Sequence, residues 1–398
     1  MSDSLDEILR QVRGRVIGAL LRLTGSLDLA EDAFQEAALA ALVAWPARGL
    51  PDSPAAWLTT AAKNHIRDGQ RHRAVAQAKA SALREDDMLD PFDVDAIADD
   101  QLRLILTCCH PLLPRETQVA LTLKVIAGFT TDELARAFLC PEPTMAQRLV
   151  RAKRTIDEKG LPFELADRAA IRARLEPALA TVYLVFNEGH TASSGGLMRL
   201  DLQAEAVRLG RLLCELVPRD AEVFGLYALM AFSAARATTR AGADGALLLL
   251  SEQDRSRWDR ALVEDGLMAL QRARALGGDG VYLLQAEIAA CHATAATWES
   301  TDWAAIVALY DRLLAVTRSP VVALNRAIAV GMLRGPEEAL AALEPLAEPL
   351  EQYHHFHAAR ADCLRRLGRD PRADYEKALA LTTNEAERAF LRKRLAPA

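Results

Sequence analysis

Apolar residues recur along this chain with the period of an α-helix. In the stretch from Asp28 to Trp45, one helical face is formed by residues at positions i, i+3, i+4, i+7, i+8 and i+11, namely Phe34, Ala37, Ala38, Ala41, Leu42 and Trp45. Strict alternation of polar and apolar residues, which a half-buried β-strand would produce, is nearly absent. The periodicity therefore predicts an all-α protein, and 398 residues with 51% hydrophobic side chains suggest roughly two to three domains.

The overall charge limits how the protein can meet nucleic acid. A formal net charge of -6 excludes a chain that coats nucleic acid along its whole surface, so any contact must come from local basic patches. No apolar run reaches the ~18 residues of a membrane span, and the first residues, MSDSLDEILR, do not resemble a secretory segment. We therefore expect a cytoplasmic protein without membrane contact.

The six cysteines are scattered and include no CxxC pair, which fits a reducing compartment. Cys108, Cys109 and His110 are adjacent, but neighbours on a helix point in different directions and no second group of ligand residues accompanies them. We interpret the two cysteines as small buried residues, and we expect neither a metal nor a cofactor. Since no pair of nucleophile and base is evident, we expect no catalytic residue and no enzymatic activity.

Acidic and polar residues crowd the first turns of the helix that starts near Asp28. They are Asp28, Glu31, Asp32, Gln35 and Glu36. The helix macrodipole favours acids at a helix N-terminus, and this accounts for part of the cluster. The other interpretation is a docking face for a basic partner, and both stay open at this point.

A basic stripe marks the next helix, AAWLTTAAKNHIRDGQRHR, at residues 55–73. Its apolar face comprises Leu58, Ala61, Ala62 and Ile66. Its opposite face comprises Lys63, Asn64, Arg67 and Arg71, of which three follow one another at steps of four. Such a stripe suits a phosphate backbone, and the alternative is a solvated basic face.

An acidic run, REDDMLDPFDVDAIADD, follows at residues 84–100 and contains eight acids and one arginine. A run of this kind resists compact folding and is typical of a linker. It is either a soluble spacer or a tether that imitates the charge of nucleic acid and lies in a basic channel.

Residues 130–156, TTDELARAFLCPEPTMAQRLVRAKRTI, predict two helices joined by a short turn. Thr130 and Glu133 form a capping box, and Pro143 is placed at the start of the second helix. The buried stripe of that helix is predicted to be Met145, Leu149, Ala152 and Ile156. Its outer face then carries Thr144, Gln147, Arg151 and Arg154, with Arg148 on the flank. This is the layout of a helix-turn-helix, whose second helix reads the major groove.

Helical segments also recur in the last hundred residues. DWAAIVALYDRLL starts at Asp302, PEEALAALEPL at Pro336 and PRADYEKALAL at Pro371. These starts are 34 and 35 residues apart. A repeat of this length, with Ala327 and Ala361 at the helix crossings, resembles tetratricopeptide repeats. Less regular helical hairpins are expected upstream of them.

These segments, in this order, resemble the extracytoplasmic-function sigma factors of bacterial RNA polymerase over about residues 5–160. The resemblance implies region 2 at 1–73, an acidic linker at 74–98 and the helix-turn-helix region 4 at 99–163. A helical tetratricopeptide-like regulatory domain is expected at 164–398. Such a protein binds core RNA polymerase and promoter DNA and directs promoter-specific initiation. The partner of its repeat domain, a protein or a small molecule, stays open.

The resemblance also implies roles for individual residues. The segment DLAEDAFQEAALAALVAW would dock on the polymerase clamp through Asp32 and Glu36, with Asp28, Glu31 and Gln35 beside them. The minus-ten element would be read by Trp57, Lys63, Asn64, Arg67 and Arg71, although Trp57 has core packing as a rival role. The minus-thirty-five element would be read by Thr144, Gln147, Arg148, Arg151 and Arg154. Ala146 and Gln147 depart from the lysine and serine common in the family, so the promoter preference should differ.

Two further segments have no explanation in helical periodicity. YLVFNEGH at 183–190 is expected to be a regulatory interface that packs on the sigma part through Phe186, Asn187 and Glu188. DRSRWDR at 254–260 is interpreted as a surface ion-pair network. The alternative for the whole protein is a helix-turn-helix transcriptional regulator with a sensing repeat domain. A repeat scaffold without a DNA role would leave the basic helix unexplained.

Overall fold

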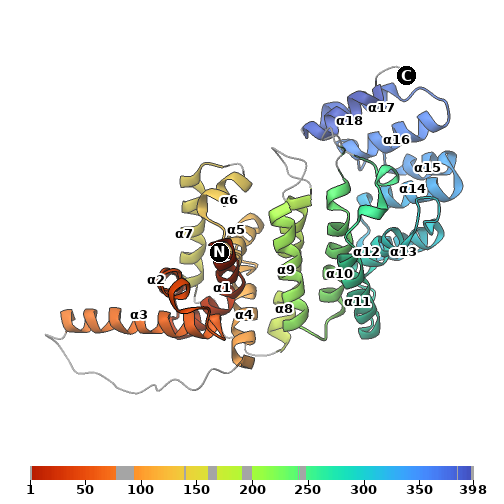
Figure 1. Cartoon of the computed structure of the whole chain (residues 1–398). Coiled ribbons are helices and arrows are strands. Elements are labelled where there is room, and N and C mark those ends of the chain that lie inside the picture. Colours follow the sequence, from red (N-terminus) through yellow and green to blue (C-terminus); the bar gives the residue numbers. More distant parts are fainter. Residues whose placement is uncertain are drawn as a thin grey trace. The chain divides into compact units, whose positions relative to one another are not determined.

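In the computed structural model, every regular element of the described residues is a helix. These residues are 2–77, 94–138, 140–159, 168–190, 200–240, 242, 248–382 and 384–395. The all-α prediction is therefore confirmed. The chain forms two compact units, Met1–Val182 and Tyr183–Ala398 (Figure 1). Within the described ranges, no helix is both long and apolar enough to cross a membrane.

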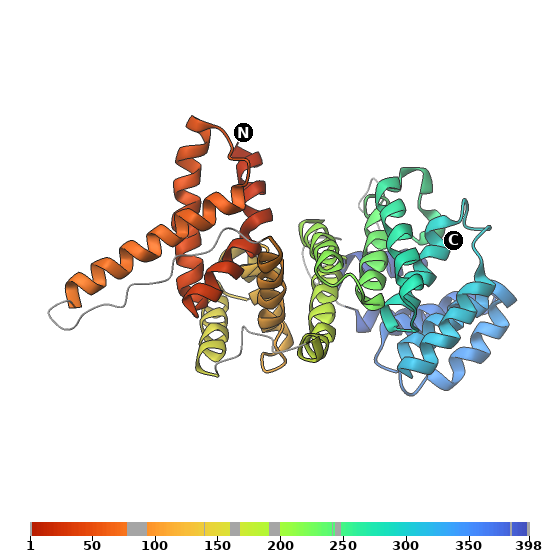
Figure 2. The same ribbon diagram turned by 90° about the horizontal axis from the view of Figure 1, so that it is seen from below.

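The first unit is a bundle around α1. Its helices are α1 (Ser2–Thr24), α2 (Leu27–Arg48), α3 (Pro54–Gln77), α4 (Val94–Cys108), α5 (Arg115–Val125), α6 (Thr131–Ala137) and α7 (Glu142–Glu158). The helix α8 (Arg168–His190) begins in this unit and ends in the second. α1 packs against α2, α3 and α4, and α7 packs against α5 and α6. In two views, α3 extends beyond the other helices of its unit (Figure 1, Figure 2).

The close crossing of α1 and α4 requires a glycine. A Cβ atom at Gly18 would lie 2.8 Å from the backbone oxygen of Asp100. Beside this crossing, Arg22 Nε lies 2.8 Å from Oδ2 of Asp100, whose side chain is buried. Asp100 ends the acidic run, so this part of the run belongs to a packed helix, whereas residues 78–93 lie outside the described part. The crossing holds α4 against the first helix of the chain.

The start of α6 has the capping box that the sequence predicts. The Thr130 N–H donates to Oε2 of Glu133 (2.7 Å), and the Glu133 N–H donates to Oγ1 of Thr130 (3.1 Å). The following helix, α7, begins at Glu142, one residue before the expected Pro143, because Pro141 is its N-cap. Local hydrogen bonding therefore fixes the start of α6, whereas the Pro141 N-cap of α7 makes no side-chain hydrogen bond.

The second unit is a succession of helices that each pack on the next. They are α9 (Leu200–Leu216), α10 (Ala221–Ala235), α11 (Arg260–Leu276), α12 (Val281–Thr294), α13 (Trp303–Thr317), α14 (Pro320–Arg334), α15 (Pro336–Leu343), α16 (His354–Arg366), α17 (Arg372–Leu381) and α18 (Glu385–Leu395). Short 3-10 turns, η1 (Ala237–Thr239), η2 (Leu250–Glu252) and η3 (Arg255–Arg257), lie between α10 and α11, and η4 (Glu344–Leu346) follows α15. The three recurring segments predicted from the sequence begin within one residue of α13, α15 and α17.

Replacing Gly18 with Ala should lower the free energy of unfolding of the first unit. Alanine gains about 1 kcal/mol of helix propensity over glycine. The added Cβ atom would meet the backbone of Asp100, which cannot move aside as the end of a flexible side chain can. Overpacking of this kind costs about 1–3 kcal/mol, so we expect a net loss of stability. Urea unfolding followed by circular dichroism would measure it.

Gly210 in α9 provides a matched control for this substitution. A Cβ atom there would meet the terminal methyl group of Met230, which is the end of a flexible side chain. Gly210→Ala should therefore change stability by less than about 1 kcal/mol. Equal losses in the two variants would contradict the role given to the α1–α4 crossing.

Candidate nucleic-acid interface

Glu31, in the second turn of α2, is buried with 4% of its surface exposed although it carries a carboxylate. Its Oε1 accepts a hydrogen bond from Nη2 of Arg13 in α1 (2.9 Å), and its Oε2 lies 2.7 Å from Nζ of Lys153 in α7. Arg13 also donates from Nε to the carbonyl of Val125 at the end of α5 (3.0 Å). One carboxylate and two cations therefore connect α1, α2, α5 and α7, and we call Arg13, Glu31 and Lys153 the buried triad.

Lys153 contacts a second acid on α2. Its ammonium lies 2.7 Å from Oδ1 of Asp28, which is 125 positions away in the chain. Burial by itself lowers the pKa of Lys153, but Glu31 and Asp28 outweigh it, so the pKa is raised above its ordinary value. The ammonium is therefore charged at neutral pH. Sequence reasoning did not single out Lys153, because its partners lie far away in the chain.

The outer face of α2 combines acids with exposed apolar side chains. Asp32, Gln35 and Glu36 are exposed, and on the same side Leu39 is 58% and Val43 77% exposed. Steps of three and four residues keep these positions on one face of the helix. A line of large apolar side chains is rarely left uncovered, so these five residues, here called the α2 stripe, have the character of a docking surface.

The apolar face of α2 is rotated from the predicted one. Leu42 lies on the apolar face that the periodicity predicts, but it is 41% exposed. The buried positions are Leu27, Ala30, Glu31, Ala33, Phe34, Ala37, Ala41 and Trp45. The residues at every fourth position from Ala33 to Trp45 face α1 and α3. Leu42 lies about 100° around the helix from Ala41, beyond the side that α1 and α3 cover.

Trp57 in α3 is half-buried and packs edge-on against Trp45 of α2, with ring centroids 5.5 Å apart. The indole therefore contributes to the contact between these two helices. This is the core role considered above, and base stacking by the rest of its surface stays a prediction.

The polar face of α3 concentrates positive charge. Asn64 and Arg67 are exposed, Lys63 is half-buried, and the side chain of Arg71 lies outside the described residues. Burial lowers the pKa of Lys63, and the nearby charges of Arg22 and Arg67 lower it further. Arg22, Lys63 and Arg67 therefore form one basic region. A phosphate anion would neutralise it.

The outer and inner faces of α7 are the predicted ones. Met145, Leu149, Ala152 and Ile156 are all buried, with 6% exposure or less. Thr144, Gln147, Arg151 and Arg154 are exposed. The four apolar residues hold α7 on the first unit and leave a polar, basic face free for a ligand.

The three arginines of α7 differ in their surroundings. Nη1 of Arg148 lies 3.2 Å from Oε2 of Glu116, and its guanidinium is above the ring of Phe138. Arg154 is paired with Glu158 one turn later (2.5 Å). Arg151 is exposed, and no described acid pairs with it. A guanidinium without a partner can approach a base edge or a phosphate without first breaking an ion pair.

The adjacent thiols are enclosed in the core. Cys108 and Cys109 have no exposed surface, and burial raises the pKa of Cys109 to about 11. Burial also raises the pKa of Cys108, so both stay protonated and unreactive. The interpretation of these two residues as buried small side chains is confirmed.

A different group of ligand residues lies in the second unit. The side chains of His354, His355 and Glu387 offer donor atoms within 4.8 Å of one another. Nε2 of His354 lies 3.0 Å from Oε2 of Glu387, whose pKa falls to about 2, mainly through this hydrogen bond. These contacts already satisfy the carboxylate, so the geometry is explained as a histidine-carboxylate pair. No local pattern predicts this group, because packing of α16 and α18 brings the three residues together.

The segment 183–190 forms the last turns of α8. Phe186 is buried and Asn187 half-buried, while the side chain of Glu188 lies outside the described residues. Tyr183 is within hydrogen-bonding distance of Gln285 in α12 (Oη–Oε1 3.5 Å). The segment is therefore anchored in the second unit, and its predicted packing on the sigma part stays a prediction.

Comparison with known families agrees with this arrangement. Residues 8–75 match Sigma-70 region 2, and residues 103–156 match Sigma-70, region 4. These ranges contain the α2 stripe, the basic face of α3 and the outer face of α7. The chain is a sigma factor of the sigma-70 type. Its two sigma regions bind core RNA polymerase and promoter DNA in transcription initiation.

The segment from the end of the first unit into the second has its own match. Residues 174–274 match a Family of unknown function (DUF6596). Over 405 residues the chain is 42% identical to Uncharacterized protein R00370 of Rhizobium meliloti (strain 1021), covering 98% of this chain and 95% of that protein. The sigma factor belongs to one family with this relative, and the likeness includes both units.

Replacing Glu31 with Ala should destabilise the first unit by about 3 kcal/mol, since removing one partner leaves buried charges without compensation. Asp32→Ala changes the neighbouring acid, which is exposed, and should alter stability by less than about 0.5 kcal/mol. Urea unfolding of both variants would measure the difference. A harmless Glu31→Ala would show that the triad does not hold the unit together.

Proposed function

We propose that this sigma factor belongs to the extracytoplasmic-function subgroup and docks on core RNA polymerase through the α2 stripe. The observation that carries the proposal is the line of exposed acids and apolar side chains from Asp32 to Val43, inside the segment that matches region 2. Apolar contacts would supply affinity, and the acids would select a basic partner. Because this partner is the polymerase, the protein would act in the cytoplasm.

The basic face of α3 would meet the minus-ten element. Asn64 and Arg67 are exposed beside Lys63, and Arg71 follows one turn after Arg67. The exposed part of Trp57 would contact a base at the start of the same helix. These residues are the proposed minus-ten surface.

The outer face of α7 would read the minus-thirty-five element. Arg151 and Gln147 offer donors for base edges, and Thr144 lies in the first turn, where a helix N-terminus suits a phosphate. Arg148 and Arg154 would exchange their acids Glu116 and Glu158 for DNA phosphates. Arg151 is therefore the strongest candidate for base recognition.

The two DNA-reading helices would have to separate on a promoter. The two elements lie about 25 base pairs apart, or roughly 85 Å along the duplex. From Lys153, which contacts Asp28, the path along α2 is only about 33 Å, and α3 adds about 20 Å as far as Arg67. The contacts of the buried triad would therefore open when both elements are bound.

The second unit would be a tetratricopeptide-like domain that regulates the sigma part in cis. The starts of α13, α15 and α17 at Trp303, Pro336 and Arg372 support a repeat of this kind. The helix α8 continues from the first unit into the second, and Thr181, just before the division, donates to Oε1 of Gln118 (3.1 Å). The segment with Phe186, Asn187 and Glu188 would transmit the regulatory signal.

In vitro transcription tests the proposed function. With core polymerase, the full chain should confer initiation at its own promoter, whereas a conventional helix-turn-helix regulator would only modulate a different sigma factor. Reversing Asp32 and Glu36 to Lys should abolish both transcription and co-purification with the core enzyme, because like charges would face the basic docking site.

The exposed pair Glu337 and Glu338 in α15 allows a control with the same change in net charge. Reversal of these two acids to Lys should leave co-purification unchanged. If the α2 variant still forms holoenzyme, the α2 stripe is not the docking surface.

Arg151→Ala should weaken sequence-specific promoter binding by about 1–3 kcal/mol and relax the preference at one base position. Arg10→Ala removes an exposed arginine from α1 and should have no such effect on base preference. Footprinting at several salt concentrations separates the roles, since a mere phosphate contact would only reduce the salt dependence. Unchanged base preference in Arg151→Ala would remove this residue from direct readout.

A further inference from the structure

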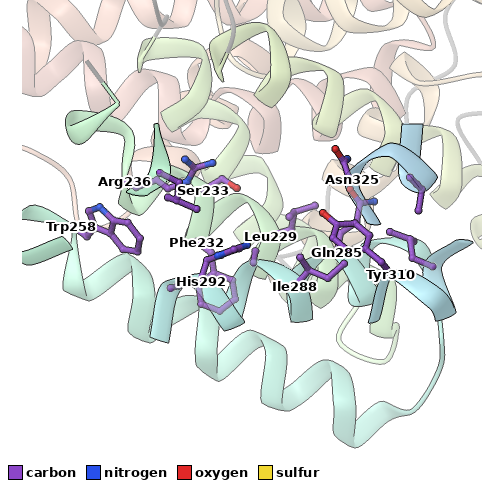
Figure 3. Close-up of a pocket in the computed structure, with 15 residues that line it drawn as sticks. Leu229, Phe232, Ser233, Arg236, Trp258, Gln285, Ile288, His292, Tyr310 and Asn325 are labelled. Carbon is purple, nitrogen blue, oxygen red and sulfur yellow. The ribbon is translucent and has the colours of Figure 1, made fainter. Parts of the chain in front are cut away.

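The second unit contains a cavity of about 220 Å³ among α10, α12, α13 and α14 (Figure 3). Its walls are mainly apolar, with Leu229 and Phe232 from α10 and Ile288 from α12. A single ring or a short chain with one polar group would fill it.

Arg236 lines this cavity at the C-terminus of α10. No described residue forms a hydrogen bond or an ion pair with its guanidinium, and no aspartate or glutamate is among the described lining residues. Burial lowers the pKa of Arg236 to about 10, which still leaves the group charged at neutral pH. Among the residues that the structure describes, this half-buried cation therefore has no anionic partner.

Two unpaired polar atoms lie at the same end of the cavity. Trp258 is 5% exposed and its Nε1 has no hydrogen-bond partner, and the same is true of Nδ1 of His292. Figure 3 shows both rings with Arg236 on one side of the cavity, away from Gln285 and Asn325. Burial, then Arg236 and Arg255, lower the pKa of His292 to about 4, so the ring is neutral and the region is electropositive.

Arg255 adds a second positive charge behind Trp258. Its guanidinium is 4.9 Å from the centre of the indole ring, and Nη1 donates to the carbonyls of His292 (2.5 Å) and Ala295 (2.8 Å). These contacts hold the indole against the end of α12. The interpretation of residues 254–260 as a surface ion-pair network was therefore wrong, because Arg255 binds carbonyls and Trp258 is buried.

A purely structural role explains Arg236 less well. A cation at a helix C-terminus gains only a small stabilisation from the macrodipole, even when it is partly buried. Arg236 is half-buried and has no counter-ion among the described residues, and the buried atoms Nε1 of Trp258 and Nδ1 of His292 also lack hydrogen-bond partners. Arg236, Trp258 and His292 together are thus more costly than the helix terminus can offset. An anion that binds here would remove the deficit.

We propose that the cavity binds a small organic acid. Its carboxylate would accept hydrogen bonds from the guanidinium of Arg236 and from Nε1–H of Trp258, and its apolar ring or chain would lie along Leu229, Phe232 and Ile288. Gln285, Tyr310 and Asn325 line the opposite side and would contact polar substituents at the far end of the ligand. Inorganic phosphate would leave the apolar wall unfilled and is therefore a poorer ligand.

This assignment gives a role to part of the segment that matches the family of unknown function. Arg236 and Trp258 both lie within residues 174–274, whereas α12, α13 and α14, which complete the cavity, follow it in the chain. The ligand would thus contact the family segment and the later helices together.

Isothermal titration of the full chain with benzoate, phenylacetate, indole-3-acetate and hexanoate tests the proposal. At least one acid should bind with a Kd below about 1 mM, and its neutral amide should bind at least tenfold more weakly. Arg236→Met should weaken the acid by about tenfold to hundredfold, the usual effect of removing a hydrogen bond to a charged group. Arg334→Met, at an exposed position in α14, should bind like the unchanged protein.

Thermal unfolding without ligand distinguishes ligand binding from a structural role of Arg236. A structural role predicts that the Tm of Arg236→Met falls. Arg236→Met should keep or raise the Tm, because it removes an uncompensated charge. If this variant does not fold, two other variants test the proposal. Trp258→Phe should lose part of the affinity for the acid. Arg236→Lys should still bind the acid more tightly than its amide. The proposal is overturned if no acid binds at 10 mM, if the amide binds equally well, or if Arg236→Met binds the acid unchanged.

Discussion

The carboxylate of Glu31, held between Arg13 and Lys153, is the interaction on which the first unit depends. A buried charge is tolerated only when it is paired, so the carboxylate of Glu31 requires its two cations. The cations come from α1 and α7, and Arg13 also reaches the end of α5. Together with the close passage of α4 over Gly18, this triad joins the helices of region 2 to those of region 4.

The acids of α2 have two different environments, and this division connects the fold to function. Glu31 points inward and is neutralised by protein cations, whereas Asp32 and Glu36 point outward next to uncovered Leu39 and Val43. On α7 the same division separates Lys153, which contacts α2, from Arg151, which has no acid partner among the described residues. Each helix therefore uses one charged face for internal contacts and leaves the other available to a partner of a sigma factor.

The second unit shows the opposite arrangement of charge. Arg236 is half-buried and has no acid partner among the described residues, and the buried nitrogen of Trp258 has no acceptor. A fold selected only for stability would pair or remove such groups, because each costs free energy. Their presence around one apolar cavity is the physical reason for assigning a ligand to it.

The sequence by itself determined the local features: the helical class, the capping box of Thr130 and Glu133, and the inward and outward faces of α7. Helix periodicity and hydrogen bonds between residues three or four apart depend only on neighbours in the chain, so a pattern suffices to predict them. Tertiary structure alone decided that Glu31 is buried, that Leu42 is exposed and that Trp258 lines a cavity with Arg236. These outcomes depend on which helices cover a face and on partners as distant as Asp28 and Lys153, which are 125 positions apart. Burial and pairing of charge are properties of that packing, and no local period encodes them.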